Sequence, residues 1–200
     1  IMPSLVGSEM CIRDSLYSLI QLNLVSVYLK KSKKHSVEIY NVPSIQYFPF
    51  VTIQLPVFNE LYVVERLLAC IVELDYPTEK LEIQVLDDST DETTEIIQNK
   101  INELAFKGID IQLIRRPIRE GYKAGALKYG LEIAKGKFIA IFDADFLPSK
   151  DFLKKTIPHF QKHSKIGVVQ TRWEHLNRKY SLLTKLQAFG LDAHFTVEQV

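Results

Sequence analysis

The chain has 200 residues, of which 46% are hydrophobic and 24% charged, and its formal net charge is +1. This length and composition indicate a globular domain with a real core and exclude a disordered chain. The balanced charge gives no reason to expect a nucleic-acid partner, and two cysteines cannot form a disulfide framework.

The first 49 residues are predicted to lie outside the main fold. Residues 1–15 look like translated sequencing-adapter sequence, so we expect them to be non-native. Residues 16–34 combine a largely apolar run with a lysine-rich end, and the run is shorter than the about 20 residues that span a bilayer. Two interpretations stay open for this segment: an amphipathic or buried helix, and the remnant of a transmembrane helix with a cytoplasmic flank. Residues 35–49 contain two prolines and are predicted to be a linker.

From residue 50 onward, short apolar runs alternate with helical patterns. This alternation predicts an α/β fold with a mostly parallel sheet flanked by helices. Strands are expected at 50–55, 81–86, 109–114, 137–142 and 166–170. Helices are expected at about 60–73, 91–106, 124–134, 150–159 and 182–200. The run at 137–142 is apolar throughout its middle, which is typical of a strand buried on both faces.

Polar side chains follow three of the predicted strands directly. They are Asn59 and Glu60, Asp87 and Asp88, and Asp143 and Asp145. Ligands of open parallel sheets bind at the carboxyl ends of the strands. We therefore expect these side chains to converge on one binding site.

Asp143 and Asp145 stand two positions apart, so in an extended chain both carboxylates point to the same side. They would repel each other unless a cation lay between them, and Mg²⁺ or Mn²⁺ suits such a pair when substrate phosphates complete the site. An acidic turn that faces water is the alternative. For Asp87 and Asp88, contact with a nucleoside and capping of the next helix both stay open.

A basic loop lies between the third predicted strand and the next helix. Its arginine forks and lysine suit a diphosphate, its glycines let backbone approach a ligand, and the helix start adds free N–H groups. The alternative is a solvated surface loop. The candidate diphosphate ligands are Arg116, Arg119 and Lys123.

Five motifs in order resemble family 2 glycosyltransferases, nearest to the cellulose-synthase-like and glucomannan-synthase-like branch. They occupy residues 51–60, 84–91, 121–127, 142–146 and 169–173, and the similarity covers about residues 50–200. The resemblance implies a GT-A, Rossmann-like fold truncated on its C-terminal side. It also implies an inverting transfer of a hexose from UDP-glucose or GDP-mannose to a polysaccharide or other glycan, with Mg²⁺ or Mn²⁺. The parent would be an integral membrane protein with a cytoplasmic-facing catalytic domain.

Carried over by position, the resemblance assigns roles to individual residues. Asp87 or Asp88 would contact the nucleoside, and Lys123 would lie near the nucleotide. The nucleotide pocket would be lined by Pro56, Asn59 and Glu60, and the metal would be bound by Asp143 and Asp145.

Two elements of the family pattern are missing. The Thr-Glu-Asp motif that supplies the general base has no counterpart before Val200, and the spacing of Gln170, Arg172 and Trp173 differs from Gln-x-x-Arg-Trp. The chain is therefore expected to bind the nucleotide-sugar but to turn it over poorly.

Two other functions stay open from the sequence. One is a non-catalytic nucleotide-binding domain. The other is a haloacid-type phosphate hydrolase with Asp143 as nucleophile, although in such enzymes the motif ends the earliest strand and here it ends the fourth.

Overall fold

The computed structural model describes residues 3–32, 44–105 and 108–195. The chain divides into two compact units. Residues 42–167 form what we call the sheet unit, and residues 1–41 together with 168–200 form the flanking unit.

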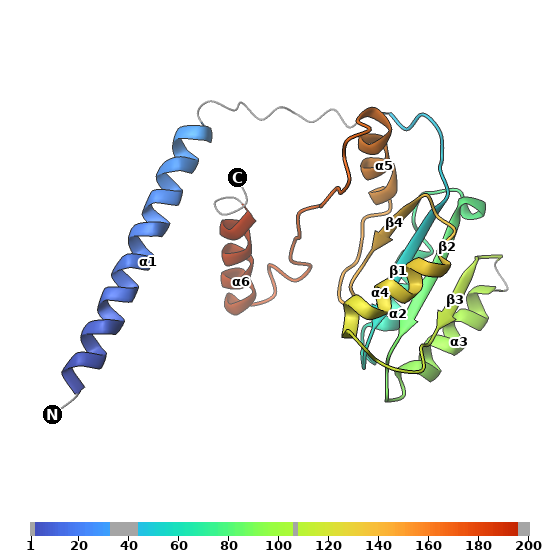
Figure 1. The fold of residues 1–200 in the computed structure, drawn as a ribbon, viewed down its shortest axis with the longest axis horizontal. Coiled ribbons are helices and arrows are strands. Elements are labelled where there is room, and N and C mark those ends of the chain that lie inside the picture. Colours follow the sequence, from blue (N-terminus) through green and yellow to red (C-terminus); the bar gives the residue numbers. More distant parts are fainter. Residues whose placement is uncertain (1–2, 33–43, 106–107, 196–200) are drawn as a thin grey trace. The chain divides into compact units, whose positions relative to one another are not determined.

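The sheet unit is built around four parallel strands in the order β3-β2-β1-β4 (Figure 1). The strands are β1 (Val51–Val57), β2 (Leu81–Asp87), β3 (Ile111–Ile114) and β4 (Phe138–Ile141). Val57 pairs with Asp87, and Gln54 pairs with Ile141, so the chain leaves β1, β2 and β4 at the same edge of the sheet. The predicted α/β fold is confirmed, and its ligand-binding edge carries the polar motifs.

Helices connect the strands and cover the sheet. They are α2 (Val64–Ile71), α3 (Thr93–Ala105), α4 (Tyr122–Ile133) and α5 (Phe152–Lys162), with a short 3₁₀ turn at Thr78–Lys80. These bounds agree with the expected helices to within a few residues. Successive strand residues point to opposite faces, so each strand contributes to two layers.

One face of the sheet is the hydrophobic core. Ile53 and Leu55 are fully buried and belong to one cluster with apolar residues of α2 and α3. The helix residues include Val64, Leu67, Leu68, Ile71, Ile97, Ile101 and Leu104. In α2 the buried side chains recur at helical spacing, which is why this short segment folds as a helix against the sheet.

The other face, under α4, is polar although it is buried. Thr52 donates a hydrogen bond to Glu82 (2.6 Å), and Gln54 donates one to Gln84 (3.0 Å), all four side chains being buried. Gly130 of α4 lies over the glutamine pair, because a Cβ there would come within 2.7 Å of the Gln54 amide nitrogen. The helix therefore packs on this polar face of the sheet through a residue without a side chain.

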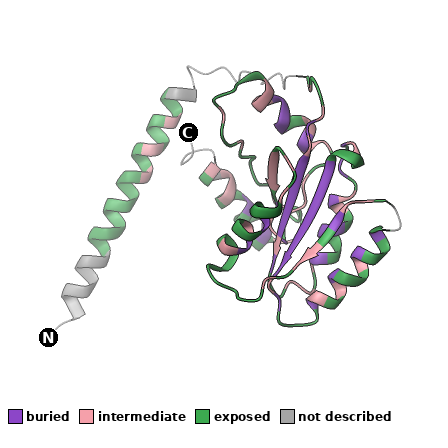
Figure 2. Cartoon of the chain, turned by 45° about the vertical axis from the view of Figure 1, so that its right-hand side comes forward, coloured by how far each residue is buried: buried purple, intermediate pink, exposed green. Residues whose placement is uncertain are grey.

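Two of the expectations for strands are wrong. Residues 166–170 form no strand, and Val168 is 82% exposed. Among the described strands, β4 pairs with β1 alone and therefore stands at the edge of the sheet. Ile141 is 49% exposed, so the strand is not buried on both faces as expected. Figure 2 shows that the buried strands are β1 and β2, which lie in the middle of the sheet.

Part of the expected linker at residues 35–49 packs against the sheet unit. The ring of Phe48 meets Tyr76 edge-on at 5.2 Å, and the Tyr76 hydroxyl donates to the Pro49 carbonyl (2.7 Å). Gln161 of α5 adds hydrogen bonds to the backbone of Gln46 and Tyr47. Residues 35–43 lie outside the described residues.

The flanking unit contains α1 (Pro3–Ser32) and α6 (Leu182–Ala193). α1 is continuous through the expected boundary at residue 15, and residues 33–34 lie outside the described residues. None of the described helices is both long and apolar enough to cross a membrane. α6 begins with a capping box, in which Ser181 and Thr184 accept hydrogen bonds from each other's backbone N–H. Residues 196–200 of the helix expected at 182–200 lie outside the described residues.

Candidate functional site

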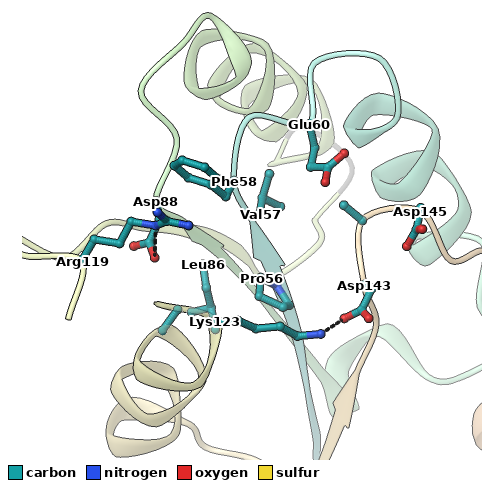
Figure 3. A pocket seen from close by; sticks show the side chains of 12 residues that line it. Pro56, Val57, Phe58, Glu60, Leu86, Asp88, Arg119, Lys123, Asp143 and Asp145 are labelled. Atoms are coloured by element: carbon teal, nitrogen blue, oxygen red, sulfur yellow. Dashed lines mark hydrogen bonds and ion pairs between the residues drawn. The ribbon is translucent and has the colours of Figure 1, made fainter. Parts of the chain in front are cut away.

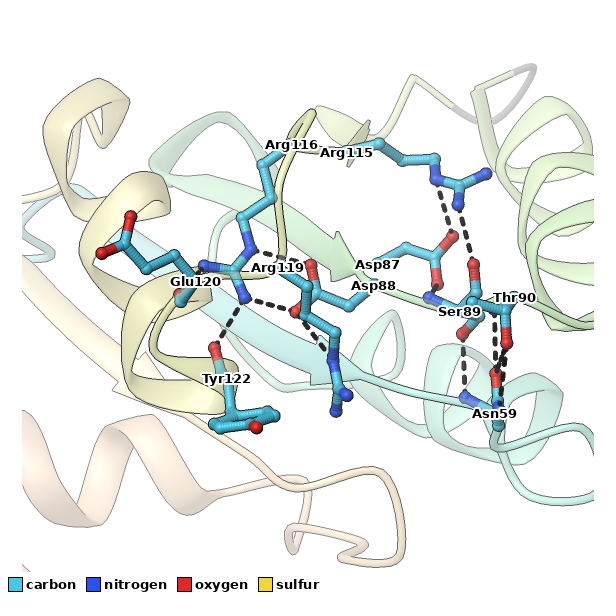
Figure 4. A network of polar contacts seen from close by, with 10 residues as sticks. All are labelled: Asn59, Asp87, Asp88, Ser89, Thr90, Arg115, Arg116, Arg119, Glu120 and Tyr122. Carbon is cyan, nitrogen blue, oxygen red and sulfur yellow. Dashed lines mark hydrogen bonds and ion pairs between the residues drawn. The ribbon is translucent and has the colours of Figure 1, made fainter.

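The loops after β1 and β2 are joined by Asn59. Its backbone is left-handed (φ 57°), a conformation that asparagine tolerates better than most residues. The backbone N–H of Asn59 donates to the Ser89 hydroxyl (2.9 Å), and its side-chain oxygen accepts from the Thr90 N–H (2.9 Å; Figure 4). Asn59 therefore fixes the two loops to each other and is not among the residues that line the pocket described below.

Asp87 is buried beneath the turn that it begins. One of its carboxylate oxygens accepts from the Ser89 N–H (2.9 Å), and the other accepts from the Thr94 hydroxyl (2.6 Å). Arg115 lies 3.5 Å from the second oxygen. These contacts give Asp87 a part in organising the turn, and the pocket-lining carboxylate of the motif is Asp88.

Both carboxylate oxygens of Asp88 accept hydrogen bonds from the guanidinium of Arg116. Arg116 Nε donates to Oδ1 of Asp88 (2.8 Å), and Arg116 Nη2 donates to Oδ2 (2.6 Å; Figure 4). Hydrogen bonding to this carboxylate raises the pKa of the Arg116 guanidinium above its ordinary value. Both side chains are 7% exposed. Arg116 is thus directed at Asp88 and does not line the pocket.

A pocket of about 270 Å³ opens at the carboxyl edge of the sheet (Figure 3). Seven of the predicted site residues line it, and they come from the ends of β1, β2 and β4, from the loops after these strands, and from the first turn of α4 and the loop before it. They are Pro56, Glu60, Asp88, Arg119, Lys123, Asp143 and Asp145. The rest of the lining is apolar: Val57, Phe58, Leu86, Ala126 and Ala144. The pocket therefore joins carboxylates and cationic groups above hydrophobic walls.

Lys123 and Asp143 form an ion pair across the pocket (Figure 3). Lys123 belongs to the first turn of α4, and Asp143 follows β4, so the pair joins two elements that are distant in sequence. Asp143 thus accommodates a cationic group already, and Asp145 lines the same pocket.

The donor set decides how a metal could be held here. Among the described residues, no group of three or more Asp, Glu, His or Cys side chains could hold a metal ion. The carboxylates of Asp143 and Asp145 in one pocket nevertheless fit Mg²⁺ or Mn²⁺. Such ions commonly take one or two carboxylates and complete their shell with substrate phosphates and water. The site fits a metal that arrives with a diphosphate.

Sequence reasoning missed Phe58 as a site residue. The guanidinium of Arg119 lies 3.4 Å from the centre of the Phe58 ring and 5.0 Å from the Tyr122 ring. Such stacking orients a guanidinium while leaving its N–H groups available in the plane. The position of Phe58 between two predicted pocket residues was the signal that could have revealed it.

The chain matches the model of glycosyl transferase family 2 over residues 52–188. It is 44% identical over 156 residues to glucomannan 4-beta-mannosyltransferase 1 of Oryza sativa subsp. japonica, covering 76% of this chain and 30% of that protein. It is 38% identical over 207 residues to glucomannan 4-beta-mannosyltransferase 9 of Arabidopsis thaliana, covering 98% of this chain and 38% of that protein. The chain thus spans about a third of the length of these relatives.

Two solved structures also match the fold of this chain. The mannosyltransferase PcManGT from Pyrobaculum calidifontis, solved in complex with GDP-Man and Mn²⁺, superposes with a TM-score of 0.62 at 30% identity, covering 72% of this chain and 41% of that one. TarS of S. aureus, at 22% identity and a TM-score of 0.50, covers 62% of this chain and 24% of that one and shares the fold. These matches confirm the GT-A fold, and with the family model they argue against a phosphate hydrolase built on Asp143. The chain belongs to glycosyl transferase family 2.

Proposed function

We propose that this chain forms the nucleotide-sugar-binding part of an inverting glycosyltransferase that moves a hexose from a nucleoside diphosphate to a glycan. The observation that carries the proposal is the pocket that is lined by Asp88, Arg119, Lys123 and the two aspartates after β4. A nucleotide-sugar has an uncharged sugar, a base with N–H groups and a doubly charged diphosphate. The pocket offers a partner for each kind of group.

The chemistry follows from where charge develops. When the bond between the anomeric carbon and the diphosphate breaks, negative charge grows on the leaving nucleoside diphosphate. Lys123 and Arg119 are the cationic side chains of the pocket, and preformed positive charge at that point stabilises the transition state. A divalent cation held by Asp143 and Asp145 would supply further neutralisation of the leaving group.

The acceptor hydroxyl oxygen forms the new bond to the anomeric carbon from the side opposite the leaving group, and its proton passes to a general base. We propose that none of residues 1–200 supplies this base, because the sequence has no counterpart of the Thr-Glu-Asp motif. The chain is therefore expected to bind the nucleotide-sugar and to transfer sugar poorly by itself.

We infer GDP-mannose as the sugar donor and a mannan-type glycan as the acceptor. The support comes from the names of the relatives, which are glucomannan mannosyltransferases, and from PcManGT, which was solved with GDP-Man. UDP-glucose is the alternative that the same pocket must be tested against. We further propose that the parent protein is a membrane protein whose catalytic domain faces the cytoplasm, for which the lysines after residue 29 are the support.

Calorimetric titration of the chain with GDP and with UDP, each with and without Mn²⁺, tests the proposal. We expect GDP to bind more tightly than UDP and Mn²⁺ to strengthen binding. Because two carboxylates without phosphate make a weak site, Mn²⁺ alone is expected to bind at least tenfold more weakly than Mn²⁺ with GDP.

The Asp145→Ala variant should lose the Mn²⁺-dependent part of GDP affinity. Asp75→Ala is the matched control, because Asp75 is an exposed aspartate paired with Lys154 outside the pocket. Unchanged Mn²⁺ dependence in Asp145→Ala would refute the metal assignment. If the intact parent protein bound GDP-mannose but transferred no sugar to any glycan, it would be a non-catalytic nucleotide-binding protein.

A further inference from the structure

The guanidinium of Arg116 lies beside the pocket and makes four hydrogen bonds to protein groups. Besides its fork on Asp88, its guanidinium donates through Nη1 to the carbonyl of Glu120 and through Nη2 to the carbonyl of Tyr122 (2.8 Å). Four of its hydrogen bonds are thus made to protein groups, and its side chain is 7% exposed. Little of this guanidinium remains to reach a ligand.

These contacts connect two parts of the pocket that are distant in sequence. Asp88 directly follows β2, while Glu120 and Tyr122 stand at the start of α4. A helix start has N–H groups and carbonyls that set the direction of its first turn, and Arg116 holds two of those carbonyls in place. The next residue along α4 is Lys123, which lines the pocket.

Gly125 leaves the space that this arrangement needs. A Cβ at residue 125 would lie 1.9 Å from the Glu120 carbonyl oxygen and 2.4 Å from Nη1 of Arg116. Contacts this short cannot exist, so any side chain at residue 125 must move the helix start, the guanidinium or both. The absence of a side chain at residue 125 is therefore what allows the Arg116 guanidinium to contact the start of α4.

Arg119 provides the contrast within the same loop. Its side chain is 37% exposed and lines the pocket. Its Nε lies 3.7 Å from Oδ2 of Asp88, and its guanidinium is stacked on Phe58 instead of being enclosed by carbonyls. Two arginines of one loop thus have different surroundings, and Arg119 is the one available to a diphosphate.

We propose that Arg116 is a positioning residue and not a diphosphate ligand. It holds the Asp88 carboxylate and the first turn of α4 in fixed relation, so that Asp88 and Lys123 present their charges to one ligand. The inference rests on the proposed function of the pocket as a nucleotide-sugar site, and it replaces the diphosphate role expected for Arg116 from sequence.

The test compares Arg116→Lys with Arg119→Lys. Lysine keeps the charge but lacks the planar fork. If Arg116 positions Asp88 and α4, Arg116→Lys weakens guanosine tenfold or more and weakens GDP by at least that factor, because Lys123 is displaced together with Asp88. If Arg116 contacts the diphosphate, GDP affinity falls and guanosine affinity does not, and this outcome overturns the proposal. Arg119→Lys is expected to weaken GDP more than guanosine.

A second measurement needs no ligand. Amide hydrogen exchange of residues 121–125 should accelerate at least tenfold in Arg116→Lys, with the exchange of β1 and β2 unchanged. Gly125→Ala, which leaves Arg116 in the chain but removes its place, should give the same acceleration. Unchanged exchange in both variants overturns the positioning role. Failure of the wild-type chain to bind any nucleotide would instead refute the proposed function, while the exchange result still decides the role of Arg116.

Discussion

Replacing Gly130 by alanine should destabilise the sheet unit, although alanine favours helices. The new Cβ would lie 2.7 Å from Nε2 of Gln54, 2.8 Å from Oε1 of Gln84 and 2.8 Å from a methyl of Leu86. Overpacking of this kind costs about 1–3 kcal/mol. Separating the buried glutamine pair costs about 1–3 kcal/mol more, and alanine returns about 0.5–1 kcal/mol through helix propensity. The expected net loss in the free energy of unfolding is about 1–5 kcal/mol.

Urea unfolding followed by circular dichroism measures this loss. With a denaturant dependence of about 2–3 kcal/mol/M, the midpoint should fall by about 1 M. Gly190→Ala in α6 is the control, because a Cβ there has nothing within 4 Å. That variant should stabilise α6 by about 0.5–1 kcal/mol, measured by amide exchange within the helix. A Gly130→Ala midpoint at or above that of the wild type would refute the close packing of α4 on the polar face of the sheet.

Two further predictions concern other buried polar groups of the sheet unit. Thr52→Val should lower the free energy of unfolding by about 2–4 kcal/mol in urea titrations, because it removes the donor to Glu82 (2.6 Å) and the acceptor for the Gly136 N–H (2.8 Å); a Thr52→Ser variant should recover most of the loss, and equal losses in both would count against the hydrogen bonds. Burial raises the pKa of Tyr76 to about 12, so its neutral form stabilises the fold below about pH 10 and this contribution is lost as the pH rises from about 10 to about 12. Absorbance titration should show one tyrosine that ionises near pH 12 and is missing in Tyr76→Phe, whereas identical titration curves would contradict the burial of this hydroxyl.

The two central strands could be predicted because apolar residues recur at every second position along each of them and turn-forming residues follow. Residues 51–57 and 81–87 pair over their full length, close to the expected 50–55 and 81–86. The segment 166–170 has the same apolar character and forms no strand. Composition indicates that a segment could join a sheet, but strand formation also needs a neighbour with free hydrogen-bonding groups, and the sequence does not specify that neighbour.

The convergence of polar motifs on one edge could also be predicted, because parallel strands end together. What each charged group contacts could not. Arg116 and Arg119 have the same chemistry and stand three residues apart, yet one is enclosed by backbone carbonyls and the other is stacked on Phe58. Likewise Asp87 and Asp88 are adjacent, and alternation between the two sides of the chain separates a turn-forming carboxylate from one that lines the pocket. Such differences depend on the three-dimensional neighbours of each side chain.

The position of β4 at the edge of the sheet has a consequence for how the molecule assembles. Val51 of β1 pairs with Leu81 on one side and with Phe138 on the other, so the second pairing closes a much longer loop of chain. Long loops close more slowly and at greater entropic cost, and a growing polypeptide presents β1, β2 and β3 before β4 has been synthesised. The pocket is lined by residues that follow β4 as well as by the ends of β1 and β2, so the binding site is complete only when β4 has joined the sheet. A ligand bound there would therefore stabilise the four-stranded sheet.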